Sequence, residues 1–225
     1  MSTKWKQSTG VRSKKAWKNF FKTLKFSTYC IFHPFDGYWD LTREKRGSMG
    51  AATFIFVLAL ITRVLRIQNT SFQFYRINYE EVNIFMEILG IMVPFLIWVV
   101  SNWALTTLFD GKGTLKQVYM ASAYAITPYP LIQLPLIILS NFITYDEGTF
   151  YWFFYYLSLG WCVLLIVFAM MMIHDYSLGK TILSTIFSVF GMAVIIFILL
   201  LFFSLIGDGI SYFYSLYKEI AFRLY

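Results

Sequence analysis

Charged residues are scarce in this sequence and are nearly missing from its long apolar segments. Asp, Glu, Lys and Arg make up 14% of the 225 residues, whereas a soluble domain carries about 25%. Hydrophobic residues make up 58% of the chain, which is more than a soluble protein of this length can bury. The composition therefore excludes a soluble globular fold and indicates a protein whose solvent is the lipid bilayer.

The residue patterns of enzyme and metal sites are also missing. Cys30 and Cys162 are far apart and have no metal-ligand spacing, so we expect two packing thiols, no metal and no other cofactor. His174 and Asp175 are adjacent, with no nucleophile nearby, and we interpret them as anchors at the membrane surface. Residues 110–114 lack P-loop spacing and predict a tight turn. We therefore predict no enzymatic activity and no catalytic residue.

Five apolar segments are each long enough to cross the bilayer, which takes about 20 residues of helix. The predicted spans are 48–67, 84–108, 118–140, 151–173 and 182–206. We predict an all-α integral membrane protein in three parts, a cytosolic region, a five-helix domain and a short interfacial helix: residues 1–47, 48–206 and 207–225. The first part has no apolar core of signal-peptide length, so we expect the first span to act as an uncleaved insertion signal.

Basic residues are concentrated on one side of the predicted spans. Residues 1–47 carry eleven Lys or Arg against three Asp or Glu, and the predicted inner segments together carry fourteen Lys or Arg against three in the outer ones. Because cytoplasmic loops are enriched in Lys and Arg, we predict a cytoplasmic N-terminus and an external C-terminus. Arg63, Arg66 and Glu87, near the outer ends of their spans, are expected to reach outward to the membrane surface.

The basic N-terminal region contains an amphipathic pattern between Lys14 and Phe32. Its apolar residues recur at helical spacing, and its lysines lie mostly on the other side. The candidate contact residues on this face are Trp17, Phe20, Phe21 and Leu24. Such a helix lies on an anionic lipid surface or packs into the groove of a partner, and the remaining alternative is a disordered basic tail.

A second aromatic cluster follows directly. Pro34 is predicted to end the amphipathic helix, and Asp36-Gly37 is typical of a turn. Phe35, Tyr38 and Trp39 are then expected to fold back onto the membrane, as further candidates for contact with lipid or a partner.

The third predicted span contains three prolines within eight residues, Pro128, Pro130 and Pro135. Proline removes a backbone donor and breaks or kinks a helix, and the carbonyl groups that it frees need new partners. The candidates to supply them are Ser122, Thr127, Tyr129 and Gln133. The break either lines a polar cavity or docking groove, or is a kink fixed by packing.

Three segments together resemble the Yip (Rab/Ypt-interacting protein) domain family of five-span membrane proteins. They are HPFDGYWDLTREKRGS (33–48), LFDGKGTLKQVYMASAYAITPYPL (108–131) and HDYSLGKT (174–181). The resemblance covers about residues 30–206 and brings no catalytic residues with it.

The first of these segments looks like the bacterial branch of the family, whose members commonly accompany carbohydrate ABC importers. This resemblance implies an accessory subunit in a hetero-oligomer with ABC permeases, in the plasma membrane of a bacterium. The alternative is a membrane-shaping or trafficking factor of the Rab-interacting type. A small solute transporter is a third hypothesis, which the lack of charge at mid-membrane disfavours. We expect neither nucleic acid nor a small-molecule substrate as a partner.

Overall fold

The computed structural model describes residues 3–75 and 82–224, and within these ranges the chain is helical and contains no strand. The N-terminal helices are α1 Thr3–Phe32 and α2 Pro34–Thr42. The helices of the bundle are α3 Met49–Asn69, α4 Ile84–Ala104, α5 Thr106–Phe109, α6 Leu115–Ala125, α7 Pro128–Leu139, α8 Gly148–His174 and α9 Leu178–Leu224, with a 3₁₀ turn at Tyr145–Glu147.

The five predicted spans are confirmed in number and order. The segments long and apolar enough to cross a membrane are Met49–Asn69, Ile84–Ala104, Leu115–Leu139, Tyr145–His174 and Leu178–Phe222. The fold is therefore an all-α arrangement with five membrane-spanning helices, as the apolar periodicity predicts.

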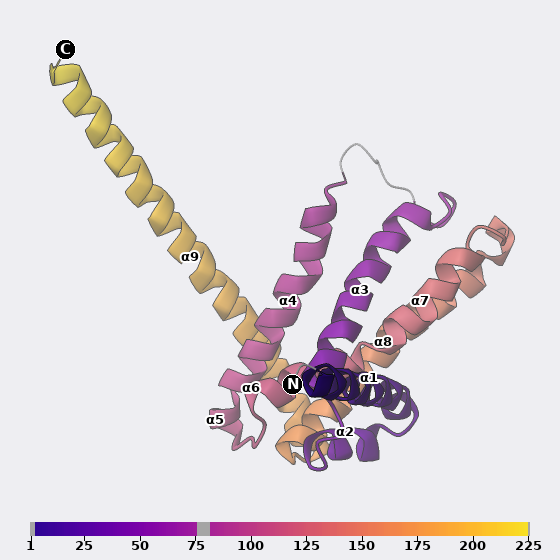
Figure 1. Ribbon diagram of the computed structural model, residues 1–225. Helices are drawn as coiled ribbons and strands as arrows, with labels where there is room; N and C mark the ends of the chain where they lie inside the picture. Colours follow the sequence, from indigo (N-terminus) through magenta and orange to yellow (C-terminus); the bar gives the residue numbers. More distant parts are fainter. Residues whose placement is uncertain (1–2, 76–81, 225) are drawn as a thin grey trace.

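The helices diverge from a common base (Figure 1). The helices α1 and α2 lie at this base, where α3, α6 and α9 begin and where α4 and α8 end. We call it the α1–α2 end and the opposite end the distal end. The core near the base is built on small residues, because Ala51 and Ala52 of α3 face Ala121 and Ala125 of α6 within one buried cluster. Small side chains allow the helix backbones to approach closely.

The prediction of a turn at Asp36-Gly37 is wrong, because both residues lie inside α2. Pro34 does end α1, but it also occupies the first turn of α2, where its fixed φ suits a helix and its missing N–H costs nothing. Gly37 serves close packing instead of a turn: a Cβ at this position would lie 2.9 Å from Cα of Cys30 in α1.

The predicted break in the third span is confirmed. The helix α6 ends at Ala125 and α7 begins at Pro128, so that two short helices replace one. The hydroxyl of Thr127 donates to the carbonyl of Tyr124 at 2.6 Å, and Gln133 Nε2 donates to Ser158 Oγ of α8 at 2.7 Å. One freed carbonyl is thus satisfied locally, while Gln133 ties α7 to its neighbour.

The predicted division at residue 207 is not observed. The helix α9 continues without interruption from Leu178 to Leu224, through Gly207 and Gly209. Glycine weakens a helix by about 1 kcal/mol but does not end it without a left-handed turn or a following proline, and neither is present here. Residues 207–224 are therefore a continuation of α9 and not a separate helix.

Candidate functional site

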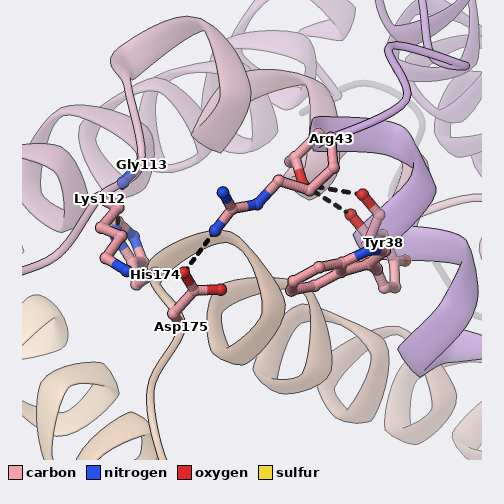
Figure 2. A network of polar contacts seen from close by, with 8 residues as sticks. Tyr38, Arg43, Lys112, Gly113, His174 and Asp175 are labelled. Carbon is pink, nitrogen blue, oxygen red and sulfur yellow. Dashed lines mark hydrogen bonds and ion pairs between the residues drawn. The ribbon is translucent and has the colours of Figure 1, made fainter.

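Five parts of the chain meet at the α1–α2 end and form what we call the polar junction (Figure 2). Its members come from the end of α2, from α4 and α9, from the α5–α6 loop and from the end of α8: Arg43, Asn102, Lys112, Gly113, His174, Asp175 and Ser188.

Local sequence explains how the two loops of the junction form. The helices α5 and α8 each end at an aspartate in the left-handed conformation, Asp110 with φ 51° and Asp175 with φ 55°. Aspartate is among the few residues that tolerate this conformation. The α5–α6 loop then ends at a capping box in which Thr114 and Gln117 bond each other's backbone, and this box begins α6.

A chain of hydrogen bonds runs through the buried part of the polar junction. The backbone N–H of Gly113 donates to His174 Nδ1 at 3.2 Å, and His174 Nε2 lies 3.0 Å from Asn102 Oδ1. Asn102 Nδ2 donates to Ser188 Oγ at 3.1 Å, and this hydroxyl donates to the carbonyl of Ser184 at 2.8 Å. The His174 side chain is only 2% exposed. The chain therefore joins the α5–α6 loop, α8, α4 and α9.

The surface part of the polar junction is ionic. Asp175 pairs with Arg43 of α2 and, at 3.1 Å, with Nζ of Lys112. The Lys112 ammonium, followed by the Arg43 guanidinium, lowers the pKa of the Asp175 carboxyl. Figure 2 shows Arg43 and Lys112 reaching Asp175 from opposite sides. One carboxylate thus holds α2 and the α5–α6 loop against the start of α9.

Two glycines allow the loop to lie directly on the His174 ring. A Cβ on Gly111 would come within 2.4 Å of the Tyr176 hydroxyl, and a Cβ on Gly113 within 2.5 Å of Ile173. Tyr176 in turn stacks on His174, with ring centroids 5.1 Å apart. The glycines of the FDGKG segment are therefore needed for close approach.

The chemistry of the polar junction is that of a structural contact. Both ring nitrogens of His174 are engaged by protein groups, so neither is presented as a base. Within residues 3–75 and 82–224, no group of three His, Cys, Asp or Glu side chains is placed to hold a metal ion. The arrangement fixes the positions of five parts of the chain relative to one another: the end of α2, α4, the α5–α6 loop, the end of α8 and α9.

The structure separates the N-terminal contact candidates into two groups. Trp17 and Phe21 are 60% and 58% exposed, and Phe35 and Trp39 are also exposed. Phe20 and Leu24 pack against the buried core, and Tyr38 is completely buried. The exposed members of α1 and α2 stay available to lipid or a partner, whereas the others hold α1 and α2 onto the bundle.

The candidates at the helix break are divided in the same way. Pro128, Pro130 and Gln133 are buried, Pro135 is exposed, and Tyr129 is half-buried and lines a cavity. Sequence reasoning placed His174 and Asp175 together as anchors at the membrane surface, but His174 is buried and only Asp175 is exposed. It also placed Arg66 outward, whereas this side chain is buried. The sequence signal for the polar junction was the GKG segment at 111–113 and the HD segment at 174–175. These segments are far apart in the sequence, so only the tertiary structure shows that they are in contact.

A chain of this architecture, with five spanning helices tied together by a polar junction at one end, is a multi-pass integral membrane protein. The family model of the Yip1 domain matches residues 28–202, and the chain belongs to this family. The matched region contains every residue of the polar junction, from Arg43 to Ser188. Neither the curated proteins nor the solved structures provide a match.

Proposed function

We propose that this protein is a non-catalytic accessory subunit that packs against other integral membrane proteins. The partners that we propose are the permeases of a carbohydrate ABC importer in a bacterial plasma membrane, with the N-terminus of this chain in the cytoplasm. The importer and its location rest on the resemblance of the HPFDGYWD and EKRGS runs to the bacterial branch of the family. Membership of the Yip1 domain family supports the membrane role itself.

The observation that carries this proposal is the bare surface of α9. No described residue of α9 after Ser188 is buried, and Figure 1 shows the helix diverging from the bundle. Its 47 residues extend for about 70 Å, against about 30 Å for the hydrocarbon core.

Lipid can therefore cover only part of α9. Beyond the most apolar part of the helix, the side chains of Tyr212, Phe213, Tyr214, Tyr217 and Phe222 are all exposed. Exposed aromatic side chains in such number are typical of protein contacts. A partner that extends beyond the bilayer would bury them.

A trafficking factor of the Rab-interacting type is the second candidate, and membership of the Yip1 domain family is equally compatible with it. The observation in its favour is the α1 helix, where Trp17 and Phe21 are exposed next to Lys18, Lys22 and Lys25. An apolar edge bordered by lysines fits an anionic membrane surface.

Co-purification from native membranes in a mild detergent tests the proposal. We expect permease subunits of a carbohydrate importer to accompany the tagged chain in near-stoichiometric amounts, as quantified by mass spectrometry. The variant Tyr214→Ser/Tyr217→Ser is expected to lose these partners, whereas the matched variant Trp17→Ser/Phe21→Ser keeps them. Recovery of the chain alone as a monomer contradicts the proposal. A small GTPase that is lost only from the α1 variant supports the second candidate.

A further inference from the structure

A cavity of about 480 Å³ lies between α3, α4, α7 and α8, toward the distal end of the bundle. Its charged residues are Arg63 and Arg66 of α3 and Glu87 of α4, and its apolar wall includes Phe56 and Ile91. Along α3, Phe56 and Arg66 are ten residues apart, which corresponds to about 15 Å. The cavity therefore has one charged end and one apolar end.

The charges at the distal end of this cavity do not balance among the described residues. Arg63 Nη2 forms an ion pair with Glu87 Oε2 at 2.8 Å, so these two groups neutralise each other. Arg66 forms no ion pair within residues 3–75 and 82–224. Among the residues that the structure describes, one positive charge is left over at this site.

Arg66 is held by aromatic rings. Its Cζ lies 3.9 Å from the ring centroid of Tyr155 and 4.9 Å from that of Tyr75. The side chain is only 3% exposed, lines the cavity, and its Nε has no hydrogen-bond partner. The hydroxyls of Tyr151 and Tyr155 also lie near the guanidinium. Rings stabilise a cation without accepting a strong hydrogen bond, so the buried Nε–H still lacks an acceptor oxygen.

The shape of the cavity identifies what would supply these oxygens. A guanidinium matches the geometry of a phosphate group, to which it can donate two parallel hydrogen bonds. The α4 wall is exposed at Met86 and Gly90, on a helix that can span the membrane, so the opening faces lipid. The apolar end suits an acyl chain and gives no reason for a dissolved anion to enter. We propose that this cavity binds an anionic phospholipid, whose phosphate accepts hydrogen bonds from Arg66 and whose acyl chain lies along Phe56.

Gly90 offers a way to block the cavity without touching Arg66. A Cβ added to Gly90 meets no atom within 4 Å, so this wall of the cavity has room for a larger residue, and Gly90→Leu is designed to fill the opening. Gly160 of α8 has equally open surroundings but does not line the cavity, which makes Gly160→Leu the matched control.

Native mass spectrometry of the full chain in detergent, with equal amounts of phosphatidylglycerol and phosphatidylcholine added, measures the binding. Both lipids carry a phosphate, but the choline cation of phosphatidylcholine balances its charge, so the experiment measures recognition of the net negative charge beside Arg66. We expect the wild type to show about a tenfold preference for phosphatidylglycerol. Gly90→Leu is expected to lose the bound phosphatidylglycerol, and Gly160→Leu to retain it. Equal retention by the two leucine variants, or a wild type without the preference, overturns the proposal.

Two further arms identify the chemical group that is recognised. Arg66→Gln is expected to remove the preference for phosphatidylglycerol, and Arg66→Lys, which keeps the charge but loses the planar fork, to retain part of it. An Arg66→Gln chain that folds and keeps the full preference contradicts the role of Arg66. An excess of inorganic phosphate is expected to leave the bound lipid in place. Displacement of the lipid would show that the site binds dissolved phosphate, and would overturn the lipid assignment.

Discussion

The backbone N–H of Gly113 points at Nδ1 of His174, 3.2 Å away. Because a backbone N–H can only donate, Nδ1 must accept, and the ring is neutral with its proton on Nε2. That proton faces Asn102 Oδ1, so the amide group of Asn102 is oriented to donate to Ser188. The contact between Gly113 and His174 thus sets the direction of every hydrogen bond that follows in the polar junction.

Replacement of His174 by alanine is expected to destabilise the fold by about 2–4 kcal/mol, because it leaves a cavity and two buried groups without partners. Thermal unfolding of the detergent-solubilised protein measures the change. His33 is an exposed histidine in the link between α1 and α2, and His33→Ala is the control, expected to stay within about 0.5 kcal/mol. Equal effects of the two substitutions would contradict the buried role of His174.

Gly113→Ala is expected to cost about 1–3 kcal/mol, because its Cβ would overlap Ile173 and the His174 ring. At Gly179, near the start of α9, an added Cβ meets nothing within 4 Å. Gly179→Ala is therefore expected to be neutral or to stabilise by up to about 1 kcal/mol. Unfolding of both variants under the same conditions provides the comparison, and a harmless Gly113→Ala would refute the close packing of the loop.

Asp175→Asn removes the charge but keeps a residue that tolerates the left-handed conformation, so it isolates the ion pairs to Arg43 and Lys112. These pairs are partly exposed, and we expect a loss of about 0.2–1 kcal/mol at neutral pH. The two partners lower the pKa of Asp175 below its usual 3.8.

The ionic contribution of Asp175 is therefore complete above pH 3.8 and disappears as the pH falls through the lowered pKa. Unfolding measured as a function of pH should show wild type and Asp175→Asn converging under acidic conditions. A difference between them that grows on acidification would be inconsistent with this linkage.

Cys30 is expected to resist thiol reagents in the folded protein. Burial, and secondarily the charge of Asp40, raises the pKa of its thiol to about 12, so that little thiolate exists at neutral pH. In the variant Cys162→Ser, Cys30 is the only thiol. Maleimide labelling of this variant should be slow in mild detergent and complete in SDS. Fast labelling in mild detergent would mean that α1 does not stay packed on α2.

The predicted orientation can be tested with single cysteines at the two ends of the bundle. Glu44 follows α2 at the base, and Asp146 lies in the distal 3₁₀ turn, and both are exposed. With the N-terminus inside, a membrane-impermeant maleimide should label Asp146→Cys on intact cells and Glu44→Cys only after lysis. The opposite pattern would reverse the orientation assigned from the basic residues.

Sequence alone was sufficient where one physical rule dominates. Spanning a bilayer requires about 20 apolar residues, and each of the five segments satisfies this requirement. The break at Pro128 followed from the missing N–H and the steric demand of proline. The prediction of a turn at Asp36-Gly37 was wrong because Gly37 is needed for the close approach of α1 to α2 and not for a turn. Dipeptide composition cannot distinguish these two uses of glycine.

The polar junction and the Arg66 cavity could not be derived from spacing. His174 and Asn102 are 72 positions apart, and only the packing of α4 and α8 against α9 brings them together. Arg66 looked like a residue that reaches for the membrane surface, because nothing local indicates that Tyr155 of α8 will cover it. Both features depend on tertiary contacts between residues distant in sequence.

The attachment of α9 is confined to its first turns, where Thr181, Ser184 and Ser188 are buried and Gly191 lies against Ser101 of α4. From Met192 to Phe222 no residue is buried, and this part of the helix is a rod of about 45 Å. A tilt of about 5° at its root would therefore move its tip by about 4 Å. A rearrangement of a few side chains at the attached end of α9 would therefore produce a larger movement of its C-terminal end, and a molecule bound there would move with it.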